Sequence, residues 1–540
     1  MSHIGLDVGF TGTKAVIFST KGDILARSYF DYGSRYKKDL LEKGEINPKF
    51  ILNGIKKVLS ACNSRSLKDK PKTIAVSVSG DDLFPMDKKG RPLYNALASY
   101  NQKPVKYRDL ISDKLDGPEN IFNETGQVLD TDIMGLPRIL WLIDNIPNLL
   151  DKTWKFLCWE SYINLYLTGI AATDFSNASR FVTFDINKNC WSDKILGVFG
   201  LSEDKMPEAL LAGSTIGKIR DKVADELELP YGLHVVAGGF DQATAALGAG
   251  VIDEGKFSLG MGTVFASHWA ADGFKKLHED KKPYKDKEAY KNKNLKAIKR
   301  IDGAGFINGA PAKAYPYCSY LIKDKYMGLL CNFNGSNIVN WFFDNLASYE
   351  KARYKNKVYD YYNEKIDPSP SNLFFMPHFM GATYPVNDLN SRGTCIGLDL
   401  STGKKDLLKS IYEGLAFELK INYSNLAKVS GFNIDSIIAI GGSSRSRVWL
   451  QILSNILNIN ISTVTIDEGG CLACAILGAV SSGEFADITE GVKSLVKIKD
   501  SFAPESKNHS LFEDKFEIYK TIYENTKKFS DHLSRHKKGV

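Results

Sequence analysis

Short apolar runs separated by glycine-rich turns open the chain. Ile4 to Val8 is apolar, the turn Gly9-Phe-Thr-Gly-Thr13 follows, and a second apolar run spans Ala15 to Phe18. A turn at Lys21-Gly-Asp23 then leads into a third run that begins at Ile24. Apolar runs of about four to eight residues bounded by such turns are typical of β-strands. The pattern therefore predicts a β-meander whose first bend is large enough to hold a phosphate.

The same pattern returns in the middle of the chain. The segment Phe257-Ser-Leu-Gly-Met-Gly-Thr-Val-Phe-Ala266 again has the pattern of a strand, a glycine-rich turn and a strand. A repeat at this spacing predicts two domains of one plan. The chain contains 45 glycines, so two unrelated glycine-rich hairpins are the alternative.

Predicted strands alternate with predicted helices between and after these hairpins. Thr73 to Ser79 is a strand pattern, and Gly135 to Asn145 has helical spacing. His234 to Ala237 is a buried-strand pattern, which we expect to break at Gly238-Gly239, and an alanine-rich helix follows over 242–249. This alternation is typical of an α/β fold.

The second half continues the alternation. Residues 406–429 and 448–457 have helical spacing, 437–440 is a strand pattern, and the last thirty residues are charged, as in a peripheral helix. A boundary near 250–255 predicts an N-terminal domain over 1–250 and a C-terminal domain over 251–485. Residues 486–540 are then a peripheral helical extension.

Composition narrows the class of protein. The chain has 540 residues, of which 43% are hydrophobic and 25% charged, as in soluble globular proteins of two or more domains. The net charge of +7 is a mild excess, and the densest basic run, 275–300, also contains acidic residues. We therefore expect that run to be a solvated loop and not a nucleic-acid patch, although a positive bias favours an anionic nucleotide.

Cysteine usage and the N-terminus point to one compartment. Eight cysteines are scattered, and the one CxxC pair, Cys471 and Cys474, lies in a run of small and apolar residues that predicts a helix with two buried thiols. The N-terminus has no basic and apolar leader, and no run of about 18 apolar residues occurs. We expect a cytoplasmic protein that neither crosses nor binds a membrane.

The first glycine-rich turn has the residues of a phosphate site. Its glycines allow backbone N–H groups to converge on an anion, Gly12 among them, while Thr11 and Thr13 add hydroxyl donors and Lys14 adds a positive charge. Asp7 ends the preceding strand, where it could hold Mg²⁺ directly or through water. The alternative is a plain tight hairpin, in which Asp and Gly are common.

Two later turns are candidates for the rest of a nucleotide. Gly260, Gly262 and Thr263 repeat the phosphate-turn pattern. A second candidate turn, formed by Gly441, Gly442 and Ser443, follows a strand and precedes a helix, so a planar base could lie against its backbone; an ordinary strand-to-helix turn is the alternative. A Walker A motif is absent, because 213–218 is one residue short and lacks the final Ser or Thr.

Asp241 is the candidate general base. It follows a buried strand and a Gly-Gly pair and begins a helix, at the carboxyl end of a strand where α/β sheets bind ligands. A helix N-cap is the alternative for the same residue.

Five segments in order resemble the FGGY carbohydrate kinases of the actin–hexokinase–Hsp70 superfamily. They are GLDVGFTGTKAVIF, DFSNASRFVTFDINKNCW, AGGFDQATAALGAG, SLGMGT and the stretch from YEGLAFELK to SNIL, and they span residues from about 3 to 485. The resemblance implies two ribonuclease-H-like (actin-like ATPase) domains with a cleft between them, ATP and Mg²⁺ as cofactors, and Asp241 as the base.

The segments expected to touch the sugar depart from the family. Xylulokinase-like members carry SGQMHG where this chain has Ser79-Gly-Asp-Asp-Leu-Phe84, and Trp-Asn-Asp-x-Arg where it has Ser99-Tyr-Asn-Gln-Lys103. The resemblance therefore implies a rewritten sugar pocket. The residues that we expect to bind substrate are Asp81, Asp82, Asn101, Lys103 and Gln242.

The predicted activity is transfer of the γ-phosphoryl group of ATP to a hydroxyl of a small ketose or polyol, most simply a pentulose such as xylulose. A hexulose, a sugar acid or a signal-molecule diol is an alternative substrate. The alternative classes are a non-catalytic actin-like nucleotide sensor or scaffold, which retention of Asp241 disfavours, and an Hsp70-like ATPase, for which no peptide-binding domain is recognisable after residue 485. The expected partners are the sugar or polyol and ATP, with no nucleic acid, and a homodimer is left open.

Overall fold

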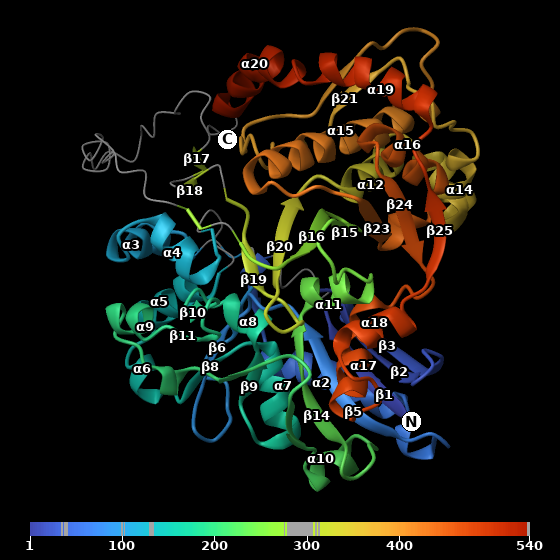
Figure 1. Cartoon of the computed structure of the whole chain (residues 1–540). Coiled ribbons are helices and arrows are strands. Elements are labelled where there is room, and N and C mark those ends of the chain that lie inside the picture. Colours follow the sequence, from blue (N-terminus) through green and yellow to red (C-terminus); the bar gives the residue numbers. More distant parts are fainter. Residues whose placement is uncertain are drawn as a thin grey trace. The chain divides into compact units, whose positions relative to one another are not determined.

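The computed structural model describes residues 1–33, 36, 42–98, 101, 103–128, 134–274, 276–277, 306–307, 310–311 and 314–536 (Figure 1). These residues form two compact units. Unit 1 comprises 1–248, 271–327 and 468–495, and unit 2 comprises 249–270, 328–467 and 496–540. Most of the lysine-rich run 275–300, expected to be a solvated loop, lies outside the described residues, as do Ser99, Tyr100 and Gln102.

The first main sheet has six strands in the order β13-β14-β5-β1-β2-β3. The predicted N-terminal meander is confirmed, because β1 (Ser2–Val8), β2 (Gly12–Ser19) and β3 (Ile24–Asp31) pair antiparallel in succession. On the other side of β1 lie β5 (Pro71–Val78) and β14 (His234–Phe240), both parallel to it.

The expected end of a strand at Gly238-Gly239 is wrong. Strand β14 continues to Phe240, and its register against β5 shifts between Val236, opposite Ala75, and Gly239, opposite Ser77. Two residues of β14 therefore oppose one of β5, which is a β-bulge. Gly238 is required here because a Cβ atom on it would lie 2.0 Å from the carbonyl oxygen of Val76.

Helix α17 (Gly469–Ser481) packs on this sheet through small residues. A Cβ atom on Gly5 of β1 would lie 2.1 Å from the carbonyl oxygen of Cys471, so the helix and the strand approach backbone to backbone. Cys471 and Cys474 are buried and free, which confirms their prediction as buried thiols. Helix α11 (Asp241–Gly248) in turn packs against α17.

The second main sheet has seven strands in the order β19-β20-β16-β15-β23-β24-β25. The predicted hairpin is confirmed as β15 (Lys256–Met261) and β16 (Phe265–Ala271). Strand β23 (Ser436–Ile440) runs parallel to β15, and β24 (Asn460–Val464) runs parallel to β23. In each sheet, the first strand of a hairpin pairs on its other side with a parallel strand, and a second parallel strand lies next to that one. This is the repeated plan that the sequence predicted.

The other elements complete the two units. In the first sheet and around it lie β13 (Thr215–Lys218), α2 (Pro48–Ala61), α7 (Trp159–Thr168), β9 (Ala172–Asp174), α8 (Phe175–Ser179), α18 (Ile488–Leu495) and the predicted α5 (Gly135–Asn145). The remaining elements before the second hairpin are β4 (Glu45–Ile46), β6 (Phe84–Met86), β7 (Ala96–Leu97), α3 (Tyr107–Lys114), α4 (Pro118–Thr125), α6 (Leu149–Lys152), β8 (Lys155–Leu157), β10 (Phe184–Asp185), β11 (Cys190–Trp191), α9 (Asp193–Val198), β12 (Glu208–Leu210) and α10 (Asp221–Glu226). Later elements are β17 (Phe306–Ile307), β18 (Ala310–Pro311), β19 (Tyr317–Ser319), β20 (Tyr326–Asn332), α12 (Ser336–Asn345), α13 (Ser348–Tyr354), α14 (Val358–Asn363), β21 (Phe374–Met376), β22 (Thr394–Ile396), α15 (Lys404–Ser430), α16 (Arg447–Leu457), β25 (Ile498–Phe502), α19 (Ser506–Tyr519) and α20 (Ile522–His536).

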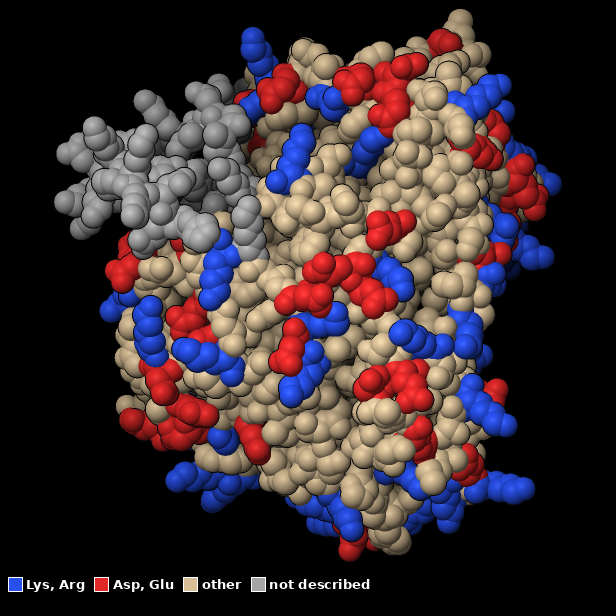
Figure 2. All heavy atoms as spheres, in the orientation of Figure 1, with Lys and Arg blue, Asp and Glu red and all other residues tan. Residues whose placement is uncertain are grey.

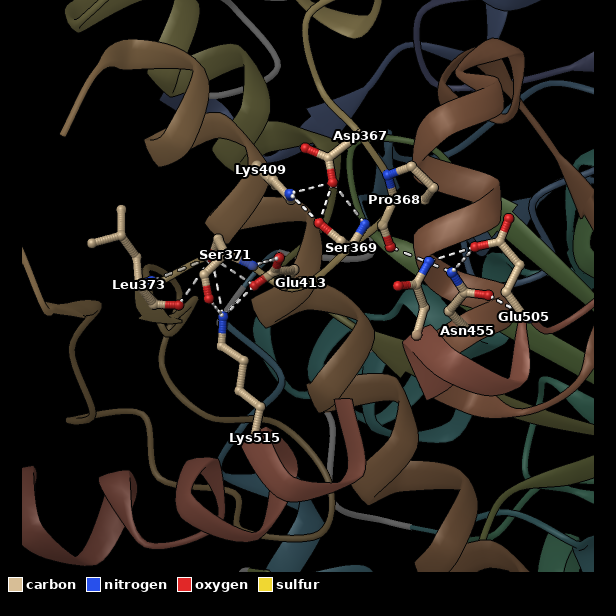
Figure 3. Close-up of polar contacts among 11 residues, drawn as sticks. Asp367, Pro368, Ser369, Ser371, Leu373, Lys409, Glu413, Asn455, Glu505 and Lys515 are labelled. Atoms are coloured by element: carbon tan, nitrogen blue, oxygen red, sulfur yellow. Dashed lines mark hydrogen bonds and ion pairs between the residues drawn. The ribbon is translucent and has the colours of Figure 1, made fainter. Parts of the chain in front are cut away.

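Helix α19 is attached to α15 by a buried ion pair (Figure 3). The Lys515 ammonium lies 2.5 Å from Oε2 of Glu413 and also donates to the carbonyl and hydroxyl oxygens of Ser371. Beside it, Lys409 of α15 contacts Asp367 at 3.0 Å. Helix α19 is therefore anchored to the rest of unit 2 by an ion pair between two buried side chains.

Surface charge and helix length bear on the class of protein. On the face drawn in Figure 2, the Lys and Arg side chains of the described residues are interspersed with Asp and Glu and form no continuous basic stripe. Among the described residues, no helix has the length and apolarity that crossing a membrane requires.

Candidate active site

The candidate active site of unit 1 is built where three parallel strands end. Strands β1, β5 and β14 run in the same direction, so their carboxyl ends meet at one edge of the sheet. Asp7 near the end of β1 lies opposite Ser77 of β5, and Asp241 directly follows β14. This is the edge where α/β sheets bind ligands.

A chain of hydroxyl groups joins Asp7 to the backbone of Asp241. Oγ of Ser77 donates to Oδ1 of Asp7 at 3.0 Å and lies 2.8 Å from Oγ1 of Thr244, which donates to the carbonyl oxygen of Asp241 at 2.9 Å. Burial raises the pKa of Asp7 above its ordinary value, while the hydrogen bond from Ser77 and the charge of Lys14 lower it.

The Asp241 carboxyl group has an unused acceptor. Its Oδ1 atom is enclosed and has no hydrogen-bond partner among the described residues. Burial, and then the charges of Asp7 and Asp81, raise the pKa of Asp241 to about 8. A half-buried carboxyl group that has one enclosed oxygen without a partner and a pKa near neutral pH is suited to accept a proton from a substrate.

Asp81 is held by Arg180, which the sequence analysis did not single out. Nε of Arg180 lies 2.7 Å from Oδ1 of Asp81, and the guanidinium also donates to Oε1 of Gln127 at 3.0 Å. The same guanidinium lies over the ring of Phe240, 4.9 Å from its centroid, directly before Asp241. Arg180 therefore brings Asp81 and the base to one place.

Asp82 has one oxygen without a partner and lines a small pocket. It is 1% exposed, and its Oδ2 accepts a hydrogen bond from the Trp159 indole at 2.9 Å, while Oδ1 has no partner among the described residues. Gly9, Tyr36 and Ser79 line the pocket with Asp82 and Trp159. Burial raises the pKa of Asp82 to about 6. This enclosed oxygen has an unused capacity to accept a hydrogen bond.

The side chains of Asn101 and Lys103 bind to other groups of the protein. Nδ2 of Asn101 donates to the carbonyl oxygen of Gly44 at 2.7 Å, and Lys103 lies 2.7 Å from Oε1 of Glu45. The buried Arg138 connects this region to the Asp81 loop, because its guanidinium donates to the carbonyl oxygens of Asp81, Leu97 and Ala98. Gln242 follows Asp241 in α11 and is partly exposed.

The first hairpin is more buried than its sequence indicated. Thr11 is exposed, but Thr13 is fully buried and its hydroxyl contacts that of Tyr32. Gly12 packs against Tyr29, since a Cβ atom on Gly12 would lie 2.5 Å from the Tyr29 hydroxyl oxygen. Lys14 forms an ion pair with Glu468.

The expected nucleotide residues of unit 2 lie side by side. Gly260 of β15 is opposite Ile440 of β23, so the turn at Gly262 and Thr263 and the turn at 441–443 follow neighbouring parallel strands. A Cβ atom on Gly441 would lie 3.3 Å from backbone atoms of Met261.

Helix α12 joins the same group of turns, which no motif in the sequence had indicated. Its first two backbone N–H groups donate to the carbonyl oxygens of Gly262 and Thr263 at 3.1 Å. The hydroxyl oxygens of Ser336 and Ser443 lie 2.7 Å apart.

The chain belongs to the FGGY family of carbohydrate kinases. Residues 2–248 match the FGGY family of carbohydrate kinases, N-terminal domain, and residues 310–482 match the C-terminal domain. The protein is therefore a phosphotransferase of the ATP-binding carbohydrate kinases, with the two-sheet α/β fold of that family.

Relatives along the whole chain differ in substrate. The chain is 24% identical to a xylulose kinase of Lactococcus lactis, over 98% of each chain, and 23% identical to a gluconokinase of Bacillus licheniformis, over 94% of this chain and 92% of the other. Its fold is similar to that of Plasmodium falciparum glycerol kinase with ADP, with a TM-score of 0.77 and 20% identity over 99% and 98% of the two chains. Family membership thus defines the reaction class and leaves the sugar open.

Proposed function

We propose that this kinase phosphorylates a hydroxyl of a small neutral ketose or polyol, a pentulose such as xylulose, with Asp241 as the general base. The observation that carries the proposal is the enclosed Oδ1 atom of Asp241, which has no partner among the described residues. A neutral hydroxyl is a weak nucleophile near pH 7, and a positioned base contributes about 10²–10⁴-fold to the rate. The unpaired oxygen supplies the acceptor that this step needs.

The carboxylates of unit 1 support a neutral substrate. Four carboxyl groups, those of Asp7, Asp81, Asp82 and Asp241, stand against the guanidinium groups of Arg138 and Arg180. Arg180 is bound to Asp81, and Arg138 to backbone carbonyl oxygens. The charge of Arg138 acts on Asp82, but the Arg138 guanidinium donates to backbone carbonyl oxygens. A substrate carboxylate or phosphate would therefore meet mainly carboxylate and carbonyl acceptors in this region.

Asp82 is the proposed contact to the sugar. Its Oδ1 atom accepts a hydrogen bond from a substrate hydroxyl, while Trp159 fixes the other oxygen. Asp81, Asn101, Lys103 and Gln242 are proposed to line the same region, Asp81 with its charge shared with Arg180. Several hydroxyl groups on a pentulose or polyol suit such acceptors.

Asp7 is the proposed residue for Mg²⁺. A single carboxylate, supplemented by water and nucleotide phosphates, is a common protein contribution to a magnesium site. The half-buried, hydroxyl-bonded Asp7 fits that role, and no group of three or more acidic, His or Cys residues among the described ones offers a richer site. When bound, Mg²⁺ neutralises charge on the transferring phosphoryl group.

The nucleotide contacts are proposed separately for each unit. In unit 1 they are Thr11, Gly12, Thr13 and Lys14, where Thr13 offers its backbone because its hydroxyl contacts Tyr32. In unit 2 they are Gly260, Gly262 and Thr263 for phosphate, with Gly441, Gly442 and Ser443 for adenine.

A coupled assay of ADP release over a panel of substrates tests the proposal. The panel contains xylulose, ribulose, fructose, xylitol, glycerol and gluconate, each at equal concentration with ATP and Mg²⁺. We expect the highest kcat/KM for a neutral pentulose or pentitol and the lowest for gluconate. A preference for gluconate would overturn the assignment of a neutral substrate and leave the kinase class intact.

A further inference from the structure

Glu160 is a fully buried carboxylate that the proposed reaction does not use. It lies in the first turn of α7, is 0% exposed, and accepts four hydrogen bonds. Its Oε1 accepts from the N–H of Gly238 at 2.7 Å. Its Oε2 accepts from the Thr173 hydroxyl at 2.7 Å, the Asp174 N–H at 2.8 Å and the Asn177 side-chain amide at 2.9 Å.

Its bond to Gly238 falls at the bulge of β14. A bulge places two residues against one and leaves a backbone group without its partner in the ladder. The Gly238 N–H is directed to Glu160 instead of to β5. A buried N–H without an acceptor is destabilising, so Glu160 stabilises the bulge itself.

A second side chain of the same cluster binds the next part of the strand. Oγ of Ser176 in α8 accepts from the N–H of Phe240 at 2.9 Å. Asp174 caps α8 by accepting from the N–H groups of Ser176 and Asn177, and Asn177 also donates to Glu160. The residues before the base are therefore bound by one connected group of buried polar side chains.

A carboxylate is required at position 160. All four partners approach Glu160 as donors, and an ionised carboxylate is acceptor-only. A glutamine there would turn an N–H₂ group towards at least one of these donors, because each oxygen of Glu160 already accepts.

We propose that Glu160 is a positioning residue for Asp241: it holds the β14 bulge, and through it the start of α11, in the arrangement that points the Asp241 carboxyl group at the substrate. This inference rests on the proposed role of Asp241 as the base. A displacement of about 1 Å at a reacting group can cost on the order of 10²-fold in rate, so a residue that contacts no substrate can control kcat.

The test is a double-mutant cycle of Glu160→Gln and Asp241→Asn. We expect Glu160→Gln to lower kcat at least tenfold, with the KM for ATP within twofold of the wild-type value. In the Asp241→Asn background, Glu160→Gln should cause no further loss, because the group that it positions is already inactive. Glu160→Asp, which keeps the carboxylate, should recover part of the loss.

The control is Glu484→Gln, which exchanges a carboxylate for an amide in unit 1 at the bond to His3. Its kcat should stay within twofold of the wild type. Wild-type kcat in Glu160→Gln, or an equal further loss in the Asp241→Asn background, would overturn the positioning role. Near wild-type turnover in Asp241→Asn alone would instead overturn the proposed base.

A milder variant keeps the inference testable if Glu160→Gln does not fold. Ser176→Ala removes the acceptor for the Phe240 N–H and leaves Glu160 intact. We expect a fall of about threefold to tenfold in kcat that disappears in the Asp241→Asn background. An unchanged kcat in a folded Ser176→Ala protein, with Glu160→Gln unfolded, would count against positioning by this cluster.

Discussion

Lys14 in the first glycine-rich hairpin forms an ion pair with Glu468, the residue that directly precedes helix α17. Burial disfavours the charge of Lys14, yet the hydrogen bond and the charge of Glu468 hold the pKa of Lys14 above its ordinary value. The hairpin is thereby fixed to a helix that lies far along the chain. The lysine remains charged for a phosphate, but it has a competing partner.

The first prediction separates these two roles of Lys14. Lys14→Met should raise the KM for ATP by about tenfold or more, since a hydrogen bond to a charged group contributes about 1.5–3 kcal/mol. Glu468→Gln keeps the lysine charge and should change that KM less than threefold. Initial-rate kinetics at saturating sugar measure both. Equal stability losses with unchanged KM in both variants would mean that Lys14 only anchors α17.

The second prediction concerns the base. Asp241→Asn keeps the size of the side chain and its hydrogen bonding but removes a useful proton acceptor. We expect kcat to fall at least about a hundredfold while ATP binding, measured by calorimetry, stays near normal. Asp221→Asn, an exposed substitution at the start of α10, is the matched control. Turnover close to wild type in Asp241→Asn would remove this residue from the mechanism.

The third prediction is a pH dependence. Asp241 acts as a base only when unprotonated, and its pKa is raised to about 8, first by burial and then by Asp7 and Asp81. The kcat/KM for sugar should therefore rise with pH and level off above the pKa. Asp81→Asn removes one of the charges that raise this pKa and frees Arg180, which lowers it, so the midpoint should move to lower pH. A midpoint that moves upward would contradict this account.

The fourth prediction concerns Asp82. Asp82→Asn exchanges an acceptor for a donor at the small pocket, so we expect the KM for sugar to rise about tenfold or more. The KM for ATP should be unchanged. Trp159→Phe removes only the hydrogen bond to Oδ2 and should have a smaller effect on the same KM. An unaltered KM for sugar in Asp82→Asn would place the substrate elsewhere.

The fifth prediction concerns stability of unit 2. Glu413→Gln breaks the buried pair with Lys515, and leaving a buried charge without its partner costs about 3–5 kcal/mol. Amide hydrogen exchange in α19 should become faster by the corresponding factor. Lys404→Met, which breaks the more exposed pair with Glu350, is the control and should cost about 0–1 kcal/mol. Equal effects of the two variants would show that burial of the Glu413 pair adds nothing.

Local patterns predicted the elements of the fold well because their signals are local. The hairpins of both sheets and helices such as α5 follow from apolar spacing within a dozen or so residues. The predicted end of the strand at Gly238-Gly239 was wrong because the cause of this glycine pair is not local in the sequence. Glycines do end strands, but here Gly238 fits against the backbone of Val76 on a neighbouring strand, and only the pairing of the two strands reveals a bulge.

The candidate site was predictable in outline and not in its contacts. The order of the motifs predicted that Asp7, Asp81 and Asp241 serve one reaction. The three residues lie near one another in unit 1. The partners that set their properties come from distant stretches of sequence: Arg180 for Asp81 and Glu160 for the strand before Asp241. A single sequence carries no sign of such pairing, since each partner looks like an ordinary buried or surface charge.

Unit 1 is assembled from three separate stretches of the chain, with β1 in the first and α17 in the last. During synthesis β1 leaves the ribosome early, while the helix that covers it emerges only after the whole stretch 249–467 has been made. Until then, the position on β1 where Gly5 meets Cys471 has no covering helix. Apolar surface that is exposed during folding is prone to aggregate, and chaperones bind such surface. A nascent chain stalled before Gly469 should be bound by such chaperones, and release of the last helices should end that dependence.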